Sequence, residues 1–240
     1  MQFYFIRHGQ STNNVLIAQT GSSQGRGHDP ELTCTGQRQA EQLARFLQQT
    51  GPGTATRGWD LYNLAGFGIT HVYTSLMIRA AATGSIVAEA LRLPLVAWEE
   101  LHETGGIYQG DEQSDLKVGQ PGLNRAEFEA RFPSLVLPDS LNEIGWWSRP
   151  FEEPGQWPVR ARRFLDDLIE RHGSAGDRVA VISHGGFYNQ FMAALLNLPA
   201  PDGYWFLMNN TAITRIDFSA EGIALIYSNR VDFLLKEMIT

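Results

Sequence analysis

Two apolar runs that each end in histidine and glycine constrain this chain more than any other sequence feature. The first, residues 3–6, is too short for a helix, is rich in strand-forming residues, and leads into Arg7 and His8. The second, residues 178–183, leads into His184. Continuous apolar runs of this length predict strands that are buried on both faces of a parallel sheet. Ligands of open α/β sheets bind beyond the carboxyl ends of such strands, where both histidines would lie.

Helical and strand patterns alternate along most of the remaining chain. Amphipathic or apolar spacing predicts helices over residues 11–19, 37–49, 77–93, 159–172 and 187–198. Further strands are predicted over residues 69–74, 94–98, 212–218 and 223–228, and the last two form a hairpin pattern. This alternation predicts an α/β fold: a three-layer sandwich with a mostly parallel sheet, one antiparallel strand, and helices on both faces.

The segment at about 105–158 interrupts the alternation. It holds six of the eleven prolines and three of the six tryptophans, and a short helix is predicted over residues 125–132. Disorder requires low apolar content, so we expect the segment to fold over the sheet as an inserted lid. Residues 1–240 would then form one domain that carries this insertion.

Composition excludes several classes of partner. The formal net charge is −7, and nine acidic against four basic residues between positions 106 and 158 place −5 of it in the insertion. This charge argues against nucleic acid and against anionic membranes. No apolar run approaches the roughly 18 residues of a membrane span. The single cysteine, Cys34, and the absence of a charged leader before the first strand predict a cytoplasmic protein.

Four predicted strand ends place complementary side chains at one edge of the sheet. Arg79 follows the strand that ends near Ser75 and lies at the start of a helix, where free N–H groups favour an anion. Glu103 follows the short strand 94–98. Two histidines, two arginines and a carboxylate in one crevice suit the binding of a phosphoryl group and its transfer through a histidine.

The chain resembles the histidine phosphatase superfamily, which includes the cofactor-dependent phosphoglycerate mutases. Each motif is weak alone, but five in the family's order are specific. The resemblance runs from residue 2 to about 230 and is weakest in the insertion. The matching pieces are Arg7-His8-Gly9 with Asn14, Leu32 to Ala40, Ser75 with Arg79-Ala80, Leu101-His102-Glu103, and Ser183-His184-Gly185-Gly186.

The resemblance implies a role for each phosphate-binding residue. His8 would be the nucleophile that carries a phosphoryl group transiently. Arg7, Arg79 and His184 would bind the phosphoryl oxygens, whose negative charge spreads in the transition state. Asn14 would add a neutral donor, although a simple position at a helix N-terminus also explains it. No metal or other cofactor is required.

The resemblance also implies a general acid and base. Glu103 would protonate the leaving alcohol and then accept a proton from the attacking water. Glu99 and Glu100 lie close by, so a shifted register remains an alternative. His102 borders Glu103, but His102, like His28, His71 and His172, is expected to be a surface or turn residue.

The expected substrate is a small phosphomonoester, and the expected reaction is hydrolysis. The family's phosphoglycerate mutases resemble one another in having basic residues soon after the catalytic glutamate, and residues 104–112 contain none. An acidic lid would also repel a multiply charged glycerate. Mutase-type phosphotransfer remains the alternative, and a phospho-ligand-binding module without catalysis is an alternative of another class. The oligomeric state stays open, a homodimer included.

Residues of the substrate pocket are harder to predict. Thr33, Tyr108 and Trp146 are expected to line the pocket, and Trp147 and Phe151 would support an apolar or aromatic leaving group. The alternative is that these aromatic residues form a small core of the insertion's own.

Overall fold

The first strand lies beside the central strand of the main sheet. The structure is a computed structural model that describes residues 1–49, 60–110, 116–199 and 201–240. In this part of the chain the main sheet has seven strands. Their spatial order is β6 (Leu135–Val136), β3 (Leu95–Ala97), β2 (His71–Thr74), β7 (Arg178–Ser183), β1 (Gln2–Arg7), β8 (Ile213–Ser219) and β9 (Gly222–Arg230).

The direction of the strands agrees with the predicted fold class. β1 pairs in parallel with β7, and the register places Arg7 opposite Ser183. β2, β3 and β6 continue the parallel part, whereas β8 runs antiparallel to both β1 and β9. The expected α/β fold, with a mostly parallel sheet and one antiparallel strand, is therefore confirmed. Because β1 and β7 end at the same level, His8 and His184 leave the sheet side by side.

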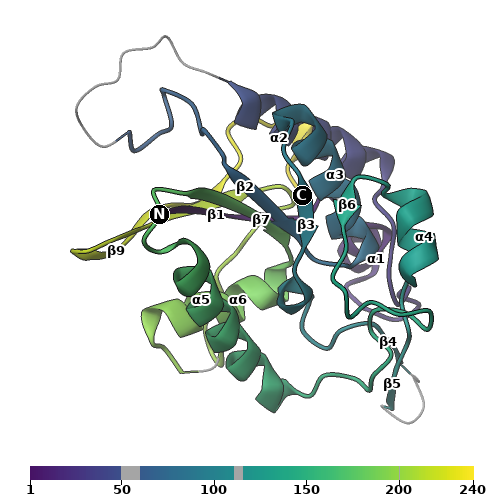
Figure 1. Cartoon of the computed structure of the whole chain (residues 1–240). Helices are drawn as coiled ribbons and strands as arrows, with labels where there is room; N and C mark the ends of the chain where they lie inside the picture. Colours follow the sequence, from purple (N-terminus) through teal and green to yellow (C-terminus); the bar gives the residue numbers. More distant parts are fainter. Residues whose placement is uncertain (50–59, 111–115, 200) are drawn as a thin grey trace.

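Helices cover both faces of the sheet, as Figure 1 shows. α2 (Cys34–Gln48) and α3 (Ile78–Leu91) pack against each other on one side, and α5 (Trp157–His172) and α6 (Gly185–Leu196) on the other. Side chains of β1 alternate between the two cores: Tyr4 and Ile6 join one, and Phe3 and Phe5 the other. This period of two explains why the run is apolar throughout.

The helices begin where capping residues allow, which moves some bounds from their predicted positions. α1 (Thr12–Thr20) begins after Ser11, as expected, because the Ser11 side chain accepts a hydrogen bond from the Asn14 amide. α2 begins at Cys34 rather than 37, because Thr33 caps it by accepting from the Gly36 amide at 3.0 Å. α2 ends at Gln48, one residue before the predicted bound at 49. Residues 50–59, which follow it, lie outside the described residues.

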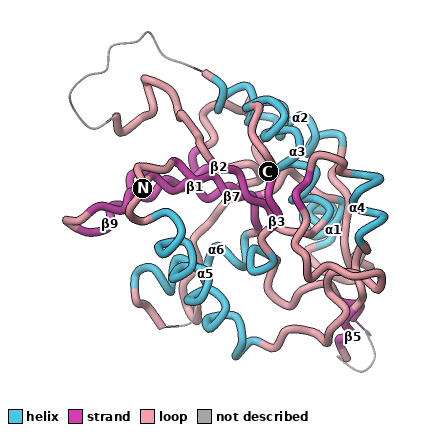
Figure 2. Tube along the Cα trace, in the orientation of Figure 1, coloured by secondary structure: helices cyan, strands magenta, loops and turns pink. Residues whose placement is uncertain are grey.

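The insertion is more closely joined to the domain than the sequence indicated. Figure 2 shows that this segment is mostly loop. Its regular elements are β4 (Tyr108–Gly110), β5 (Lys117–Gly119), α4 (Arg125–Arg131) and the edge strand β6. β6 pairs in parallel with β3, which the sequence did not predict. A strand of two residues is too short to give a periodic signal in the sequence. The insertion therefore extends the main sheet. The remaining short elements are η1 (Glu99–Leu101), η2 (Pro154–Gln156) and η3 (Lys236–Met238).

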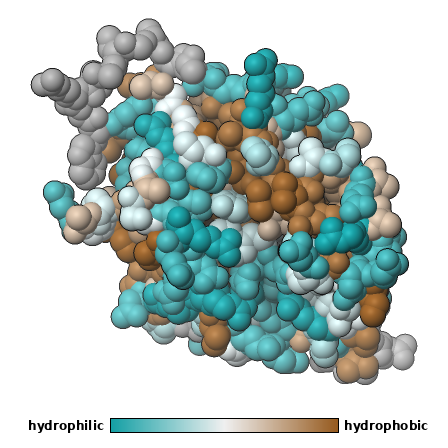
Figure 3. Space-filling model, in the orientation of Figure 1, coloured by the Kyte–Doolittle hydropathy of each residue, from teal (hydrophilic) through white to brown (hydrophobic). Residues whose placement is uncertain are grey.

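The surface is mainly polar. Figure 3 shows a largely hydrophilic face whose apolar residues gather near the middle, where β3 and its neighbours lie in Figure 1. Of the helices in the described residues, none combines the length and the apolar character needed to cross a bilayer.

Candidate active site

His8 lies directly after β1 and is almost completely buried. Its Nδ1 lies 2.6 Å from the carbonyl oxygen of Gly9, which only accepts, so Nδ1 carries the proton. Nε2 therefore has a lone pair, and it accepts a hydrogen bond from Arg79 Nε at 3.1 Å. Burial, followed by the charges of Arg79 and Arg7, lowers the pKa of His8 well below 6.5. At neutral pH the ring is thus uncharged, and its Nε2 lone pair faces the Arg79 guanidinium.

His184 follows β7, and its ring centroid lies 5.0 Å from that of His8. The Ser75 hydroxyl accepts from the Met77 amide, so its own proton is free to donate to His184 Nε2 at 2.9 Å. Nδ1 then carries a proton, and this buried atom has no hydrogen-bond partner among the described residues. Burial lowers the pKa of His184 well below 6.5, with Arg79 and His8 adding to the effect. His184 is thus a neutral donor with one N–H to offer.

Arg7 supplies a second unpaired donor. Its Nη1 donates to the Met208 carbonyl at 2.5 Å, whereas its buried Nε has no partner among the described residues. Buried donors are normally paired, and each unpaired one costs roughly 1–3 kcal/mol. Arg7 and His184 therefore present two donors that an anion would satisfy. The predicted phosphate-binding residues come together as the sequence indicated.

A close contact between the His8 loop and the first turn of α2 explains the glycine that follows His8. A Cβ on Gly9 would lie 2.4 Å from the Gly36 carbonyl oxygen, and a Cβ on Gly36 would lie 2.0 Å from that of Gln10. Only glycine fits at either position. Thr33 fixes this contact, since its hydroxyl caps α2 and donates to the Gln10 side chain at 2.7 Å. Thr33 thus supports the His8 loop and is not among the residues that line the pocket.

Glu103 lies at the N-terminus of α6. Its Oε1 accepts from the amides of Thr104 and Phe187 at 2.8 and 2.9 Å, and Oε2 accepts from the Gly186 amide at 3.1 Å. A Cβ on Gly186 would lie 2.4 Å from Oε1, so this glycine is required for the approach. Glu103 lines the same cavity as His8, and Glu99 and Glu100 do not. The geometry therefore favours the register in which Glu103 faces the phosphate.

A buried ion pair supports the turn that carries Glu103. Arg160 of α5 donates to both carboxylate oxygens of Glu152, at 2.6 and 2.8 Å, and to the carbonyl of His102. Breaking a buried pair of this kind costs about 3–5 kcal/mol. His102 packs edge-on against Trp147 and is buried, so the expectation that it is a surface or turn residue was wrong. Only the fold shows this, because the partners come from α5 and the insertion.

The position of Asn14 fits both of the roles that the sequence allowed. It is the third residue of the α1 capping box, where its Oδ1 accepts from the Ser11 amide at 2.9 Å. It also lines the cavity around His8. Asn210 links Asn14 to His8, because its Nδ2 donates to the His8 carbonyl at 3.0 Å and to Asn14 Oδ1 at 3.3 Å.

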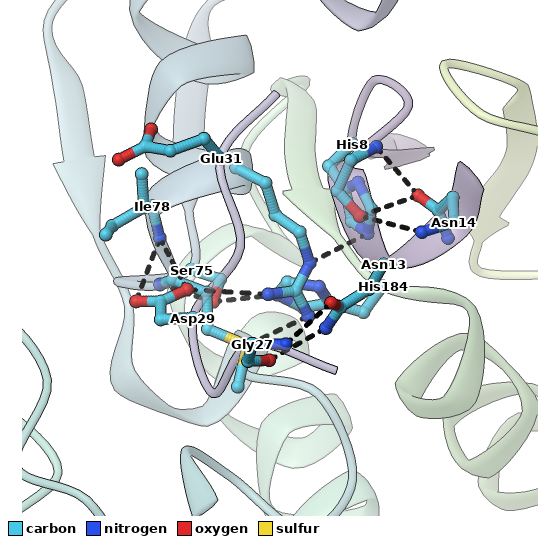
Figure 4. Close-up of polar contacts among 12 residues, drawn as sticks. His8, Asn13, Asn14, Gly27, Asp29, Glu31, Ser75, Ile78 and His184 are labelled. Atoms are coloured by element: carbon cyan, nitrogen blue, oxygen red, sulfur yellow. Dashed lines mark hydrogen bonds and ion pairs between the residues drawn. The ribbon is translucent and has the colours of Figure 1, made fainter. Parts of the chain in front are cut away.

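Asp29 is a site residue that the sequence reading missed. Its buried carboxylate accepts from the Ile78 amide at the start of α3 and lies 3.4 Å from Arg79 Nη1. Figure 4 shows it beside Ile78 and apart from His8. Burial raises the pKa of Asp29 to about 7, although the Arg79 charge acts in the opposite direction. Asp29 thus orients the arginine that contacts the nucleophile. It comes from a Gly/Ser-rich loop, which gave no periodic signal.

The cavity over His8 has a volume of about 500 Å³. On its leaving-group side the Arg26 guanidinium stacks over the Tyr108 ring at 4.2 Å. Among the described residues, no carboxylate lies within ion-pair distance of Arg26. The sequence predicted Tyr108 in the pocket but not Arg26. The exposed side chains of Trp205 and Leu207 also line the cavity, and the sequence did not predict them.

Trp146 and Trp147 lie outside this cavity. Both are buried and belong to the core cluster on the α2–α3 side of the sheet, where Trp146 packs at 5.4 Å against Trp147. The structure therefore does not bring Trp146 to the pocket. These rings fill part of the domain core and not a separate core of the insertion. Phe151 packs edge-on against Tyr108 at 4.8 Å and supports it.

The other histidines divide into two groups. His28 is exposed and His71 is partly exposed, as expected. His172 is buried, which contradicts the prediction, because it is the last residue of α5 and packs against Tyr73 and Asp177. Sequence alone showed only its place at a helix end.

Comparison with known proteins identifies the family of the chain. The family model of the histidine phosphatase superfamily (branch 1) matches residues 3–56 and 61–230. The chain therefore belongs to the histidine phosphatase superfamily, and the resemblance read from the motifs is confirmed.

Relatives in this superfamily carry different names. A relative from Yersinia enterocolitica named "Probable phosphoglycerate mutase GpmB" is 25% identical over 229 residues, and one of that name from Klebsiella pneumoniae is 26% identical over 221. Each match covers 91% of this chain and 85% of the relative.

Solved structures of phosphatases share the fold. A phosphoserine phosphatase from Entamoeba histolytica in complex with phosphoserine has a TM-score of 0.61 and 19% identity, covering 98% of this chain and 99% of the other. An α-ribazole phosphatase from Shigella flexneri has a TM-score of 0.60 and 21% identity, covering 96% of each chain.

Proposed function

We propose that this chain is a phosphomonoester hydrolase that acts through a transient phosphohistidine on His8. One observation carries the proposal. A neutral, buried His8 lies beside the Arg79 guanidinium in a cavity that Arg7 also lines, and the His184 ring packs against His8. Arg7 Nε and His184 Nδ1 are unpaired donors among the described residues. A nucleophile whose pKa lies below neutrality and a preformed set of donors are what attack on a phosphate ester requires.

The first step transfers the phosphoryl group to the protein. His8 Nε2 forms a bond to phosphorus while the bond from phosphorus to the alcohol oxygen breaks. The Arg79 Nε–H turns from His8 Nε2 to the substrate, which frees the lone pair for the attack. Arg79, Arg7 and His184 then donate hydrogen bonds to the three outer oxygens. The alcohol oxygen leaves with the proton that Glu103 donates. Glu103 Oε2 accepts one backbone hydrogen bond, whereas Oε1 accepts two, which leaves Oε2 the better placed to hold this proton.

The second step returns His8 to its initial state. Glu103 accepts a proton from water, whose oxygen attacks phosphorus while the Nε2–phosphorus bond breaks and inorganic phosphate leaves. The Gly9 carbonyl holds the proton on Nδ1 throughout, which keeps Nε2 as the reacting atom. No residue changes its net charge over the complete cycle.

We favour hydrolysis over mutase-type phosphotransfer. Phosphotransfer is the second candidate because the bacterial relatives are named as mutases. The described residues that follow Glu103 contribute Thr104 and Tyr108 to the cavity, and neither is basic. Arg26 is the cation on the leaving-group side, and it comes from a different loop. A complete set of catalytic residues also favours catalysis over a binding module. The lone thiol of Cys34 is exposed and unpaired, which favours a cytoplasmic location.

Variants of His8 and Glu103 test the proposal against a panel of phosphomonoesters. His8→Ala should abolish phosphate release from every substrate, while Glu103→Gln should retain slow turnover. Thermal melting of both variants shows whether the fold is retained. A parallel assay for 3-phosphoglycerate isomerisation separates the two candidates, since a hydrolase releases phosphate and leaves the isomer ratio unchanged. Full activity of His8→Ala would overturn the proposal.

A further inference from the structure

Three side chains of the kinds that bind transition metals lie together at the end of the sheet opposite His8. His71 begins β2, His172 ends α5, and Asp177 directly precedes β7. One ligand atom from each lies within 4.8 Å of the others. Their separation in the sequence explains why motif spacing gave no sign of them. The catalytic residues follow the carboxyl ends of the same strands, so this cluster has no contact with the phosphate site.

The carboxylate of Asp177 lies between the two imidazoles. Its Oδ2 is 2.8 Å from His172 Nδ1, and its Oδ1 is 4.0 Å from His71 Nδ1. The two ring centroids are 4.7 Å apart. In a tetrahedral zinc site, with bonds of about 2.0–2.1 Å, neighbouring ligand atoms are roughly 3.3 Å apart. Shifts of up to about 1.5 Å between ligand atoms therefore suffice to surround an ion. The His71 side chain is 42% exposed, and to bind the ion through Nδ1 it would exchange its 2.9 Å contact with the Thr70 hydroxyl for the metal.

A fourth residue orients the buried ligand. His172 Nε2 lies 3.1 Å from the Tyr73 hydroxyl. In the present state Nδ1–H donates to Asp177, and Nε2 accepts from Tyr73. With an ion on Nδ1, the ring proton lies on Nε2 and is donated to the Tyr73 oxygen. Metal-binding histidines usually donate their second N–H to such a partner, and this partner sets the ring's orientation.

We propose that His71, His172 and Asp177 form a binding site for one divalent transition-metal ion of the zinc type. Two imidazoles and one carboxylate are borderline ligands that suit zinc better than magnesium or calcium. The fourth position faces solvent beside the exposed His71. A bound ion joins β2, the end of α5 and the turn before β7. It stabilises the domain by binding the folded chain only.

Zinc titration of the metal-free full chain tests this site. We expect one Zn²⁺ per chain by calorimetry, an increase in Tm with zinc, and a tetrahedral Co²⁺ absorption spectrum. His71→Ala keeps the Tyr73–His172–Asp177 hydrogen bonds, so it should fold, retain phosphatase activity and lose at least about tenfold in zinc affinity. Tyr73→Phe keeps the packing and should lose roughly 10- to 100-fold.

Two control histidines make the test decisive. His28→Ala removes an exposed histidine elsewhere, and His8→Ala removes the one in the phosphate cavity. Both should bind zinc like the unaltered chain. Loss of the stoichiometric ion in His8→Ala would assign it to the catalytic cavity and overturn the proposal. Equal zinc affinity of His71→Ala and the unaltered chain, or a Tm that zinc does not raise, would overturn it as well.

Discussion

The two ends of the active-site cavity are built in different ways. At the phosphate end, His8, His184 and Arg79 come from strand ends and a helix start, are buried, and contact one another or adjacent backbone. At the leaving-group end, Arg26 and Trp205 come from loops and are partly or largely exposed. Under the proposed mechanism, residues at the ends of the sheet carry out the reaction, and we expect loop residues to select the ester.

The largest predicted effect concerns the phosphate end. Arg79→Lys keeps a positive charge beside Asp29 but loses the Nε–H that reaches His8 and the forked geometry that suits phosphate. We expect kcat/KM to fall roughly 100- to 1,000-fold, by a similar factor for every phosphomonoester. Steady-state kinetics on aryl, sugar and amino-alcohol phosphates would measure it. A loss confined to some substrates would contradict the assignment of Arg79 to the phosphate end alone.

A smaller and selective effect is predicted at the leaving-group end. O-phosphoserine and O-phosphoethanolamine differ by one carboxylate, so they form a matched pair. Arg26→Gln should lower kcat/KM for phosphoserine about fivefold more than for phosphoethanolamine, because a partly exposed ion pair contributes about 1 kcal/mol. Arg26→Lys, which keeps the charge, is the control. An equal loss for both substrates would mean that Arg26 acts only by holding Tyr108.

The smallest predicted effect is a pH dependence of stability that arises from Asp29. This residue lies on the same loop as Arg26 and contacts Arg79. Its folded-state pKa of about 7 lies above the ordinary 3.8, so the folded protein holds this proton more tightly than the unfolded chain. The contribution to stability is therefore full below about pH 4 and is lost as the pH rises towards 7. Asp29→Asn lacks this loss. The Tm of Asp29→Asn minus the Tm of the unaltered chain should therefore be larger at pH 8 than at pH 5, by at least about 2–4 °C.

Melting curves of both proteins at the two pH values are sufficient for this test. The side-chain amide of the Asp29→Asn variant keeps an oxygen acceptor for the Ile78 amide, so the comparison isolates the charge. A Tm difference that changes in the opposite direction would mean that Arg79 lowers the Asp29 pKa more than burial raises it.

The same division explains what the sequence revealed. His8, His184 and Arg79 were predictable because apolar periodicity locates strand ends, and parallel strands end at one edge. Arg26 and Asp29 were missed because a Gly/Ser-rich loop has no period that shows where its side chains point. Trp146 was placed wrongly because an aromatic residue in an insertion fits a pocket or a core equally well by composition. Only the residues that surround Trp146 in the fold show that it belongs to the core and not to the pocket.

The most direct test of the account is the identity of the phosphorylated atom. Glu103→Gln should slow the hydrolysis of the phosphoenzyme and allow it to accumulate after mixing with a phosphomonoester. Mass spectrometry would locate the acid-labile phosphoryl group, and phosphorus–proton NMR correlations distinguish the two ring nitrogens. The account predicts phosphorylation of His8 at Nε2, because the Gly9 carbonyl keeps the proton on Nδ1. A phosphoryl group on Nδ1, on His184, or on no histidine would contradict it.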